Sequence, residues 1–249
     1  MASPARKRRG IVTGAGSGIV KAVVARLARE GTEVLAIDID GDRLAQLSRD
    51  NCTTMRADLS DPVARDEIAA TADGADYLVN SHGLIKIKSI FEVTLEDWRQ
   101  MQQVNAESIF FMCQRVGPRL RPGGAIVNLS SSSAKFATTT EVASYAASKT
   151  TILSITRSFA YALAPRPIRV NAICPGIVDT PMQDAVLEVV APMRGTTKAE
   201  WNAQRNKAVP LGRGATPDEC AGLIWFLLSD EANYITGQAI NYTGGLVTW

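Results

Sequence analysis

Short runs of apolar, β-branched residues alternate with longer segments of helical periodicity along this chain of 249 residues. This alternation is typical of parallel βαβ units, and the length suits one α/β domain. We therefore expect a single domain, 1–249, with a Rossmann-type, doubly wound parallel sheet of about seven strands. The strands are expected near 8–13, 33–38, 52–56, 75–80, 124–130, 168–174 and 238–242, and the helices near 17–30, 41–49, 61–72, 95–115, 144–164 and 216–229.

The pattern loosens between residues 176 and 215, where prolines and glycines interrupt it. An insertion of this length before the last helix is more often a mobile lid than a separate domain. The sequence predicts a substrate lid near 181–209.

Charge and composition exclude several classes of protein. The net charge is +2 and 46% of the residues are hydrophobic, a balance that disfavours nucleic acid or an anionic membrane as a partner. The basic run 6–9 is the only support for nucleic-acid binding, and no apolar stretch follows it as in a signal peptide. Four cysteines without a CxxC pair predict reduced thiols and a cytoplasmic protein. A single histidine, His82, disfavours a metal site and a Ser/His/Asp triad.

A glycine-rich turn follows the first strand. Glycines at a strand-to-helix turn let the backbone approach a pyrophosphate, and the helix N-terminus adds N–H donors. Any tight βα turn also favours glycine, so the position of this turn after the first strand is what indicates a cofactor. The predicted cofactor contacts here are Gly14, Gly16, Ser17, Gly18 and Ile19.

Polar residues close the next three strands at the same expected edge. Asp38 ends the second strand, 24 residues after Gly14. A carboxylate at this position can accept both hydroxyls of an adenosine ribose and would repel a 2′-phosphate, so it favours NAD over NADP. The alternative is that Asp38 only starts a turn. Asp58 and Leu59 close the third strand beside an adenine site, and Asn80 and Gly83 close the fourth.

Tyr145 and Lys149 are spaced to lie on one helix face. A phenol acts as a base at pH 7 only if its pKa falls by about 3 units, or roughly 4 kcal/mol, which a nearby ammonium and an oxidised nicotinamide can supply. Tyr145 alone is equally compatible with a half-buried interface tyrosine. Ser132, which lies 13 residues upstream, could hydrogen-bond the substrate oxygen while the phenol exchanges its proton.

Together these motifs resemble the short-chain dehydrogenase/reductase superfamily, in its branch of about 250 residues. The resemblance covers essentially the whole chain, in order, through TGAGSGI at 13–19, Asp38, NSHG at 80–83, QVNAES, IVNLSSSS at 126–133, YAASK at 145–149, RVNAICPGIVDT at 169–180, PLGR and TGQAINYTGG. It implies a catalytic tetrad of Asn105, a serine, Tyr145 and Lys149. It also implies that Tyr145 and Lys149 contact the nicotinamide ribose, and that Pro175, Gly176, Ile177 and Thr180 hold the nicotinamide amide.

Three positions depart from the family pattern. Val20 replaces a usual glycine, and its β-branched side chain could crowd the pyrophosphate, an effect that a small backbone shift could absorb. His82 replaces alanine and is interpreted as structural, with a nicotinamide contact as the alternative. The strand motif points to Ser131 as the catalytic serine, whereas the distance from Tyr145 points to Ser132, which we favour here.

The predicted function is an NAD(H)-dependent oxidoreductase that interconverts a secondary alcohol and a ketone. Lys86, Lys135 and Glu141 favour a polyol, a sugar or a hydroxy acid, whereas Met182 and Val186 would also admit a small aliphatic ketone. The alternatives are a 3-oxoacyl-carrier-protein reductase, which usually prefers NADPH, and a catalytically weak NAD-binding protein owing to Val20. Relatives commonly form homotetramers, so the resemblance implies one here, with the apolar tail 245–249 against another subunit or against its own sheet.

Overall fold

The computed structural model describes residues 6–16, 18–47, 51–137 and 139–249. The predicted seven-stranded, doubly wound parallel sheet is confirmed, with the strand order β3-β2-β1-β4-β5-β6-β7. Every pair of neighbouring strands is parallel, so all carboxyl ends meet at one edge. The strands are β1 Arg9–Thr13, β2 Glu33–Asp38, β3 Cys52–Arg56, β4 Tyr77–Asn80, β5 Ala125–Leu129, β6 Arg169–Pro175 and β7 Ala239–Tyr242.

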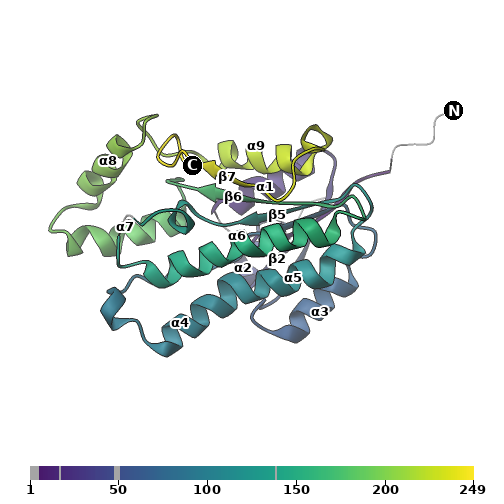
Figure 1. The fold of residues 1–249 in the computed structure, drawn as a ribbon, viewed down its shortest axis with the longest axis horizontal. Coiled ribbons are helices and arrows are strands. Elements are labelled where there is room, and N and C mark those ends of the chain that lie inside the picture. The colour runs from purple at the N-terminus through teal and green to yellow at the C-terminus, as the bar shows by residue number, and fades with distance from the viewer. Residues whose placement is uncertain (1–5, 17, 48–50, 138) are drawn as a thin grey trace.

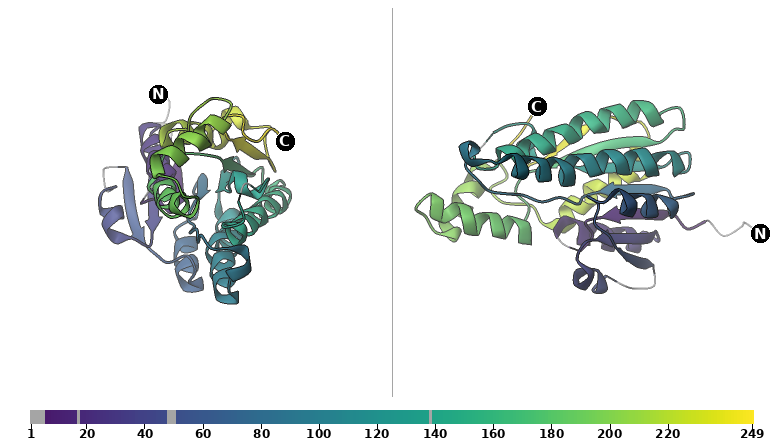
Figure 2. Two further views of the ribbon diagram at one scale, coloured as in Figure 1. Left: turned by 90° about the vertical axis from the view of Figure 1, so that its left-hand side faces the viewer. Right: turned by 90° about the horizontal axis from the view of Figure 1, so that it is seen from below.

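Helices cover both faces of this sheet (Figures 1 and 2). On one face α1 and α9 pack against the strands, and on the other α3, α5 and α6 do so. The α-helices are α1 Gly18–Arg29, α2 Gly41–Ala45, α3 Pro62–Ala70, α4 Leu95–Gln102, α5 Ser108–Val116, α6 Ala143–Leu163, α7 Pro181–Met193, α8 Lys198–Ala208 and α9 Pro217–Leu228. Short 3₁₀ turns are η1 Ile90–Glu92, η3 Gly117–Arg119, η4 Ser132–Ala134 and η5 Asp230–Ala232.

The helix expected over 95–115 is divided in two. A π-helical turn, η2 Gln103–Glu107, separates α4 from α5. In it the Ser108 N–H bonds to the carbonyl of Gln103, five residues back, which widens the helix at Asn105. Such wide turns commonly occur at functional sites.

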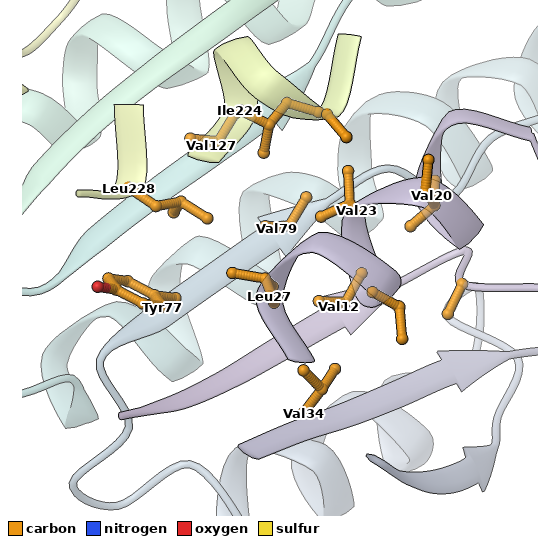
Figure 3. Close-up of a cluster of buried hydrophobic side chains, with 14 of the residues drawn as sticks. Val12, Val20, Val23, Leu27, Val34, Tyr77, Val79, Val127, Ile224 and Leu228 are labelled. Atoms are coloured by element: carbon orange, nitrogen blue, oxygen red, sulfur yellow. The ribbon is translucent and has the colours of Figure 1, made fainter. Parts of the chain in front are cut away.

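Two apolar clusters hold the layers together. Because successive strand residues point to opposite faces, Val12 packs into the cluster under α1 and α9, while Ile11 packs into the cluster under α3, α5 and α6. Val20 lies in the first cluster with only 5% of its surface exposed (Figure 3). The side chain is therefore packed in the core with residues of α1 and α9, which argues against crowding of a pyrophosphate by Val20.

Residues 181–208 form two helices rather than a loose segment. Both α7 and α8 lie beyond the carboxyl ends of the strands, at the left in Figure 1, and they project from the body of the domain. Arg194, which caps α7, lies 3.6 Å from the Glu141 carboxylate and donates to the Thr139 hydroxyl at 3.2 Å. This contact joins the helix pair to the loop that precedes α6.

The C-terminal tail is partly fixed to its own sheet. Val247 is buried and the Asn241 amide donates to the backbone oxygen of Trp249 at 2.9 Å, while the Trp249 side chain is 72% exposed. In the part of the chain that the structure describes, no helix has the length and apolar character needed to cross a membrane.

Candidate active site

The glycine turn between β1 and α1 touches the ends of three other chain segments. A Cβ at Gly14 would lie 2.8 Å from the backbone of His82, one at Gly16 would lie 3.1 Å from the Asp38 carboxylate, and one at Gly18 would lie 3.3 Å from Thr180. Gly14 and Gly18 also have φ values of 70° and 57°, which side chains strongly disfavour. The three glycines are thus required by the close packing of this turn against its neighbours, and the backbone of the turn at the N-terminus of α1 is a cradle whose polarity suits a pyrophosphate.

Asp38 faces this cradle from the end of β2. One carboxylate oxygen accepts from the Gly16 N–H at 2.9 Å and the other accepts from the Asp40 N–H at 3.0 Å. Because each carboxylate oxygen can accept two hydrogen bonds, both keep capacity for a ribose hydroxyl. The cradle and this carboxylate together fit a dinucleotide.

The remaining predicted cofactor residues are unevenly placed. Asp58 accepts from the backbone and hydroxyl of Ser60 at the end of β3, and Leu59 is buried beside it. The Asn80 side chain points away from the edge, because its amide donates to Asn128 inside the sheet. Ile19 packs against the core, and Ser17 lies outside the described residues.

The end of β6 lies on the side of the glycine turn opposite Asp38. Pro175 ends the strand, and the Gly176 N–H bonds to the carbonyl of Tyr242 at 3.0 Å. Ile177 is buried, and Thr180 caps α7 by accepting from the backbone of Gln183. Since Thr180 also lies against Gly18, the β6 loop closes over the glycine turn.

Tyr145 and Lys149 lie one turn apart on α6, with the Lys149 ammonium 5.7 Å from the centre of the phenol ring. Lys149 donates to the carbonyl of Leu129 at 3.0 Å, and burial lowers the pKa of its ammonium to about 8. Burial raises the pKa of the Tyr145 phenol above its usual value. In the protein alone the phenol therefore stays protonated at neutral pH, which is the form that can donate a proton to a ketone oxygen.

Ser131, rather than the expected Ser132, is brought to this phenol. A hydrogen bond between the Ser131 hydroxyl and Tyr145 opposes part of the rise in the phenol pKa. Ser132 begins the 3₁₀ turn η4, whereas Ser131 is the extended residue that caps it. The turn takes up the extra residue between strand and helix, so the structure brings to the phenol the serine that the strand motif indicated.

Asn105 lies at the widened turn and is held in place on every side. Its side-chain oxygen accepts from the Leu84 N–H at 2.8 Å, and its amide nitrogen donates to the Leu84 carbonyl at 2.9 Å and the Ser148 hydroxyl at 3.0 Å. A Cβ at Gly83 would lie 3.0 Å from the Asn105 oxygen and 3.4 Å from the Lys149 nitrogen. Asn105 and Lys149 therefore converge over Gly83.

The three charged residues expected to favour a polar substrate are already paired within the chain. Lys86 bonds to Asp97 at 2.9 Å, Lys135 bonds to the carbonyl of Ala239 at 2.9 Å, and Glu141 faces Arg194. A pocket of about 230 Å³ opens beside the first turn of α6, and none of the described residues that line it is charged. Its walls include Ile90, Phe136, Thr139, Thr140, Val142 and Ala146.

Arg43 was not expected near the cofactor end, since it lies five residues beyond Asp38. A Cβ at Gly16 would meet the Arg43 Cβ at 2.7 Å, and the guanidinium pairs with Asp40 at 3.0 Å. The helix that the sequence predicts over 41–49 could have indicated this position, because its first turn brings Arg43 back beside the glycine turn.

Comparisons with known proteins agree with this geometry. A family model described as enoyl-(acyl carrier protein) reductase matches residues 14–247. The chain is 35% identical to the 3-oxoacyl-acyl-carrier-protein reductase FabG of Thermotoga maritima over 95% of this chain and 96% of the relative. It is 34% identical to the galactitol 2-dehydrogenase of Agrobacterium fabrum over 94% and 95% of the two chains.

A solved structure shares the whole fold. An actinorhodin polyketide ketoreductase variant, crystallised with NADPH, superposes with a TM-score of 0.92 at 27% identity and covers 100% of both chains. This chain belongs to the short-chain dehydrogenase/reductase superfamily. It is accordingly an oxidoreductase that acts on CH–OH donors or ketones with a nicotinamide cofactor.

Proposed function

We propose that the protein is an NAD(H)-dependent dehydrogenase or reductase of a small, neutral secondary alcohol or its ketone, with Tyr145 as the general acid and base. The observation that carries this proposal is that the Tyr145 phenol is hydrogen-bonded to Ser131 while the Lys149 ammonium lies 5.7 Å from the centre of its ring. Ser131 orients the substrate oxygen, and Asn105 holds the water route that leads from Lys149 to solvent.

The proton transfer is derived from these side chains. A bound nicotinamide supplies or accepts the hydride at the carbinol carbon. In the reducing direction the Tyr145 O–H gives its proton to the ketone oxygen, while Ser131 hydrogen-bonds the same oxygen. The Lys149 cation stabilises the resulting phenolate, which recovers its proton along the Asn105 side of the site. Oxidation of the alcohol runs the same steps in reverse.

Two residues set the proposed cofactor preference. The Asp38 carboxylate binds the ribose hydroxyls of NAD and repels the additional phosphate of NADP. Arg43 lies beside the same turn, and its guanidinium is the group that would bind that phosphate if Asp38 were removed. NAD is therefore the preferred cofactor, and the Asp38 carboxylate is the group that disfavours NADP.

The proposed substrate is neutral on the assumption that it enters the pocket at the first turn of α6, whose described lining residues are apolar or carry hydroxyls. The chain resembles a galactitol 2-dehydrogenase, which fits a diol or polyol. The chief alternative is a 3-oxoacyl-carrier-protein reductase, supported by the FabG relative. Asp38 argues against it, because reductases of that kind usually use NADPH.

Three further expectations complete the proposal. The helix pair α7–α8 serves as the substrate lid, tied to the α6 loop through Arg194. The subunits assemble as a homotetramer through α4, α5 and α6, where Phe110 and Tyr161 are exposed. The cytoplasm is the expected compartment, since the four cysteines are buried and are spread along the sequence without a CxxC pair.

The experiment is a paired assay of cofactor and substrate. Calorimetric titrations with NAD⁺ and NADP⁺ are followed by turnover on neutral diols and polyols, on hydroxy acids and on a 3-oxoacyl thioester. The proposal predicts tighter binding of NAD⁺ and turnover of the neutral alcohols. Preference for NADPH together with turnover of the thioester would contradict it in favour of the acyl-carrier reductase.

A further inference from the structure

His82 is fixed at both ring nitrogens. Its Nδ1 lies 2.7 Å from the Thr13 hydroxyl and its Nε2 lies 2.5 Å from the Ser108 hydroxyl. Only 9% of the residue is exposed. The ring therefore joins the end of β1 to the start of α5.

The direction of these hydrogen bonds follows from the number of protons. The Ser108 hydroxyl donates its only proton to the carbonyl of Val104 at 2.6 Å, so it accepts from the His82 Nε2–H. Burial makes the imidazole neutral by lowering its pKa to about 3, so Nδ1 is an acceptor. It accepts from the Thr13 hydroxyl, whose alternative acceptor, the carbonyl of Val79, is farther away at 3.3 Å.

One end of this chain of hydrogen bonds holds the cofactor turn. Thr13 directly precedes Gly14, and its oxygen also accepts from the Ser81 N–H at 3.2 Å. Gly14 rests on the His82 backbone, where a Cβ would be 2.8 Å away. The Nδ1 contact thus fixes the glycine turn against the loop that follows β4.

The other end holds the proton-relay residue. Val104 and Ser108 flank Asn105 in the widened turn, where the Ser108 N–H bonds to Gln103. The bond from the Ser108 hydroxyl to Val104 closes this turn, and the His82 Nε2–H determines where that hydroxyl points. Two residues beyond His82, both backbone groups of Leu84 bind the Asn105 side chain. Loop and helix are therefore joined twice around Asn105.

We propose that His82 is a positioning residue with two separable tasks, one at each ring nitrogen. Nδ1 holds the glycine turn for the cofactor, and Nε2 holds the Asn105 turn for proton transfer. The second task rests on the function proposed above. Alanine, the usual residue at this position in the family pattern, has no atom that could perform either task.

Two conservative variants separate these tasks. In His82→Asn the amide oxygen takes the place of Nδ1 and the contact with Ser108 is lost. In His82→Gln the amide nitrogen takes the place of Nε2 and the contact with Thr13 is lost. Because one buried hydrogen bond corresponds to about a tenfold effect, His82→Asn should lower kcat about tenfold with NAD⁺ affinity unchanged. His82→Gln should weaken NAD⁺ binding about tenfold by calorimetry and keep kcat.

The matched control is Ser229→Ala at the far end of α9. Its hydroxyl donates to the carbonyl of Phe226, three residues earlier, much as that of Ser108 does to Val104, and its loss should lower stability alone. If His82→Asn does not fold, Ser108→Ala takes its place and should lower kcat without changing NAD⁺ affinity. Variants at His82 and Ser108 that lower only the melting temperature would overturn the proposal.

The calorimetric result does not depend on turnover, so it separates the two proposals. Weaker NAD⁺ binding by His82→Gln than by His82→Asn supports the cofactor task even if the proposed alcohols are not substrates. Equal NAD⁺ affinity in the two variants overturns that task whether or not the enzyme is active.

Discussion

The Asp38 carboxylate accepts a hydrogen bond from the Gly16 N–H at 2.9 Å, between residues that are 22 positions apart. This contact ties the end of β2 to the glycine turn. It places a fixed negative charge where the adenosine ribose of a dinucleotide would lie, and Arg43 lies immediately beside it. The proposed preference for NAD over NADP therefore depends on one small cluster of residues.

Asp38→Asn should raise the KM for NAD about 10- to 100-fold, because hydrogen bonds to a charged acceptor are lost. The same variant should gain activity with NADP through Arg43, and Asp38→Asn/Arg43→Ala should lose that gain. Steady-state kinetics with both cofactors measures this, with Asp42→Asn, at an exposed position of α2, as the control for charge. NADP kinetics that do not change in Asp38→Asn would show that Asp38 does not discriminate.

Ser131→Ala should lower kcat/KM about 10- to 100-fold, since the hydroxyl that contacts both Tyr145 and the substrate oxygen is lost. Ser132→Ala is its matched control, with the same change one residue away, and should stay close to wild type. The opposite ranking in initial-rate assays would restore the choice that spacing from Tyr145 suggested.

Val20→Ala should lower the free energy of unfolding by about 2 kcal/mol, because it removes buried methyl groups from the cluster between α1 and α9. NAD⁺ affinity should not change. Urea unfolding and calorimetry measure the two quantities, and Lys21→Ala on the exposed side of α1 is the control. Tighter NAD⁺ binding would mean that Val20 does crowd the cofactor.

Wild-type stability should carry a contribution from His82 that is lost in acid. Burial lowers the imidazole pKa from 6.5 to about 3, and repulsion from Lys149 and Arg65 acts in the same direction. Attraction to Asp58 opposes this shift only weakly. The contribution is thus fully present above pH 6.5 and declines as the pH falls towards 3. Between pH 7 and pH 5 wild type should lose about 2 kcal/mol more than His82→Gln in urea unfolding. Equal losses would mean that His82 is protonated in the folded protein.

Much of the fold could be predicted because local patterns and packing agree. A parallel strand such as 169–175 is buried on both faces, and the glycine turn and Asp38 follow from strand ends meeting at one edge. The π turn at Asn105 could not be predicted, because helical periodicity runs unbroken through 95–115 and only the tertiary contacts with Leu84 and Ser148 explain it.

Other features depended on geometry that spacing does not encode. The spacing from Tyr145 favoured Ser132, whereas the 3₁₀ turn after Ser131 leaves Ser131 beside the phenol. Lys86, Lys135 and Glu141 were interpreted as substrate contacts, whereas each has a partner distant in sequence. A sequence motif predicts at which strand end a residue lies, but it does not predict whether another side chain of the protein already binds that residue.

Tyr145→Phe tests the central claim most directly, because it removes one oxygen atom and keeps the ring beside Lys149. Single-turnover hydride transfer is measured by nicotinamide absorbance, with NAD⁺ affinity measured by calorimetry on the same sample. The account predicts a loss of about 10²- to 10⁴-fold in rate with NAD⁺ binding close to wild type. A variant that keeps most of the wild-type rate would contradict the assignment of Tyr145 as the acid and base.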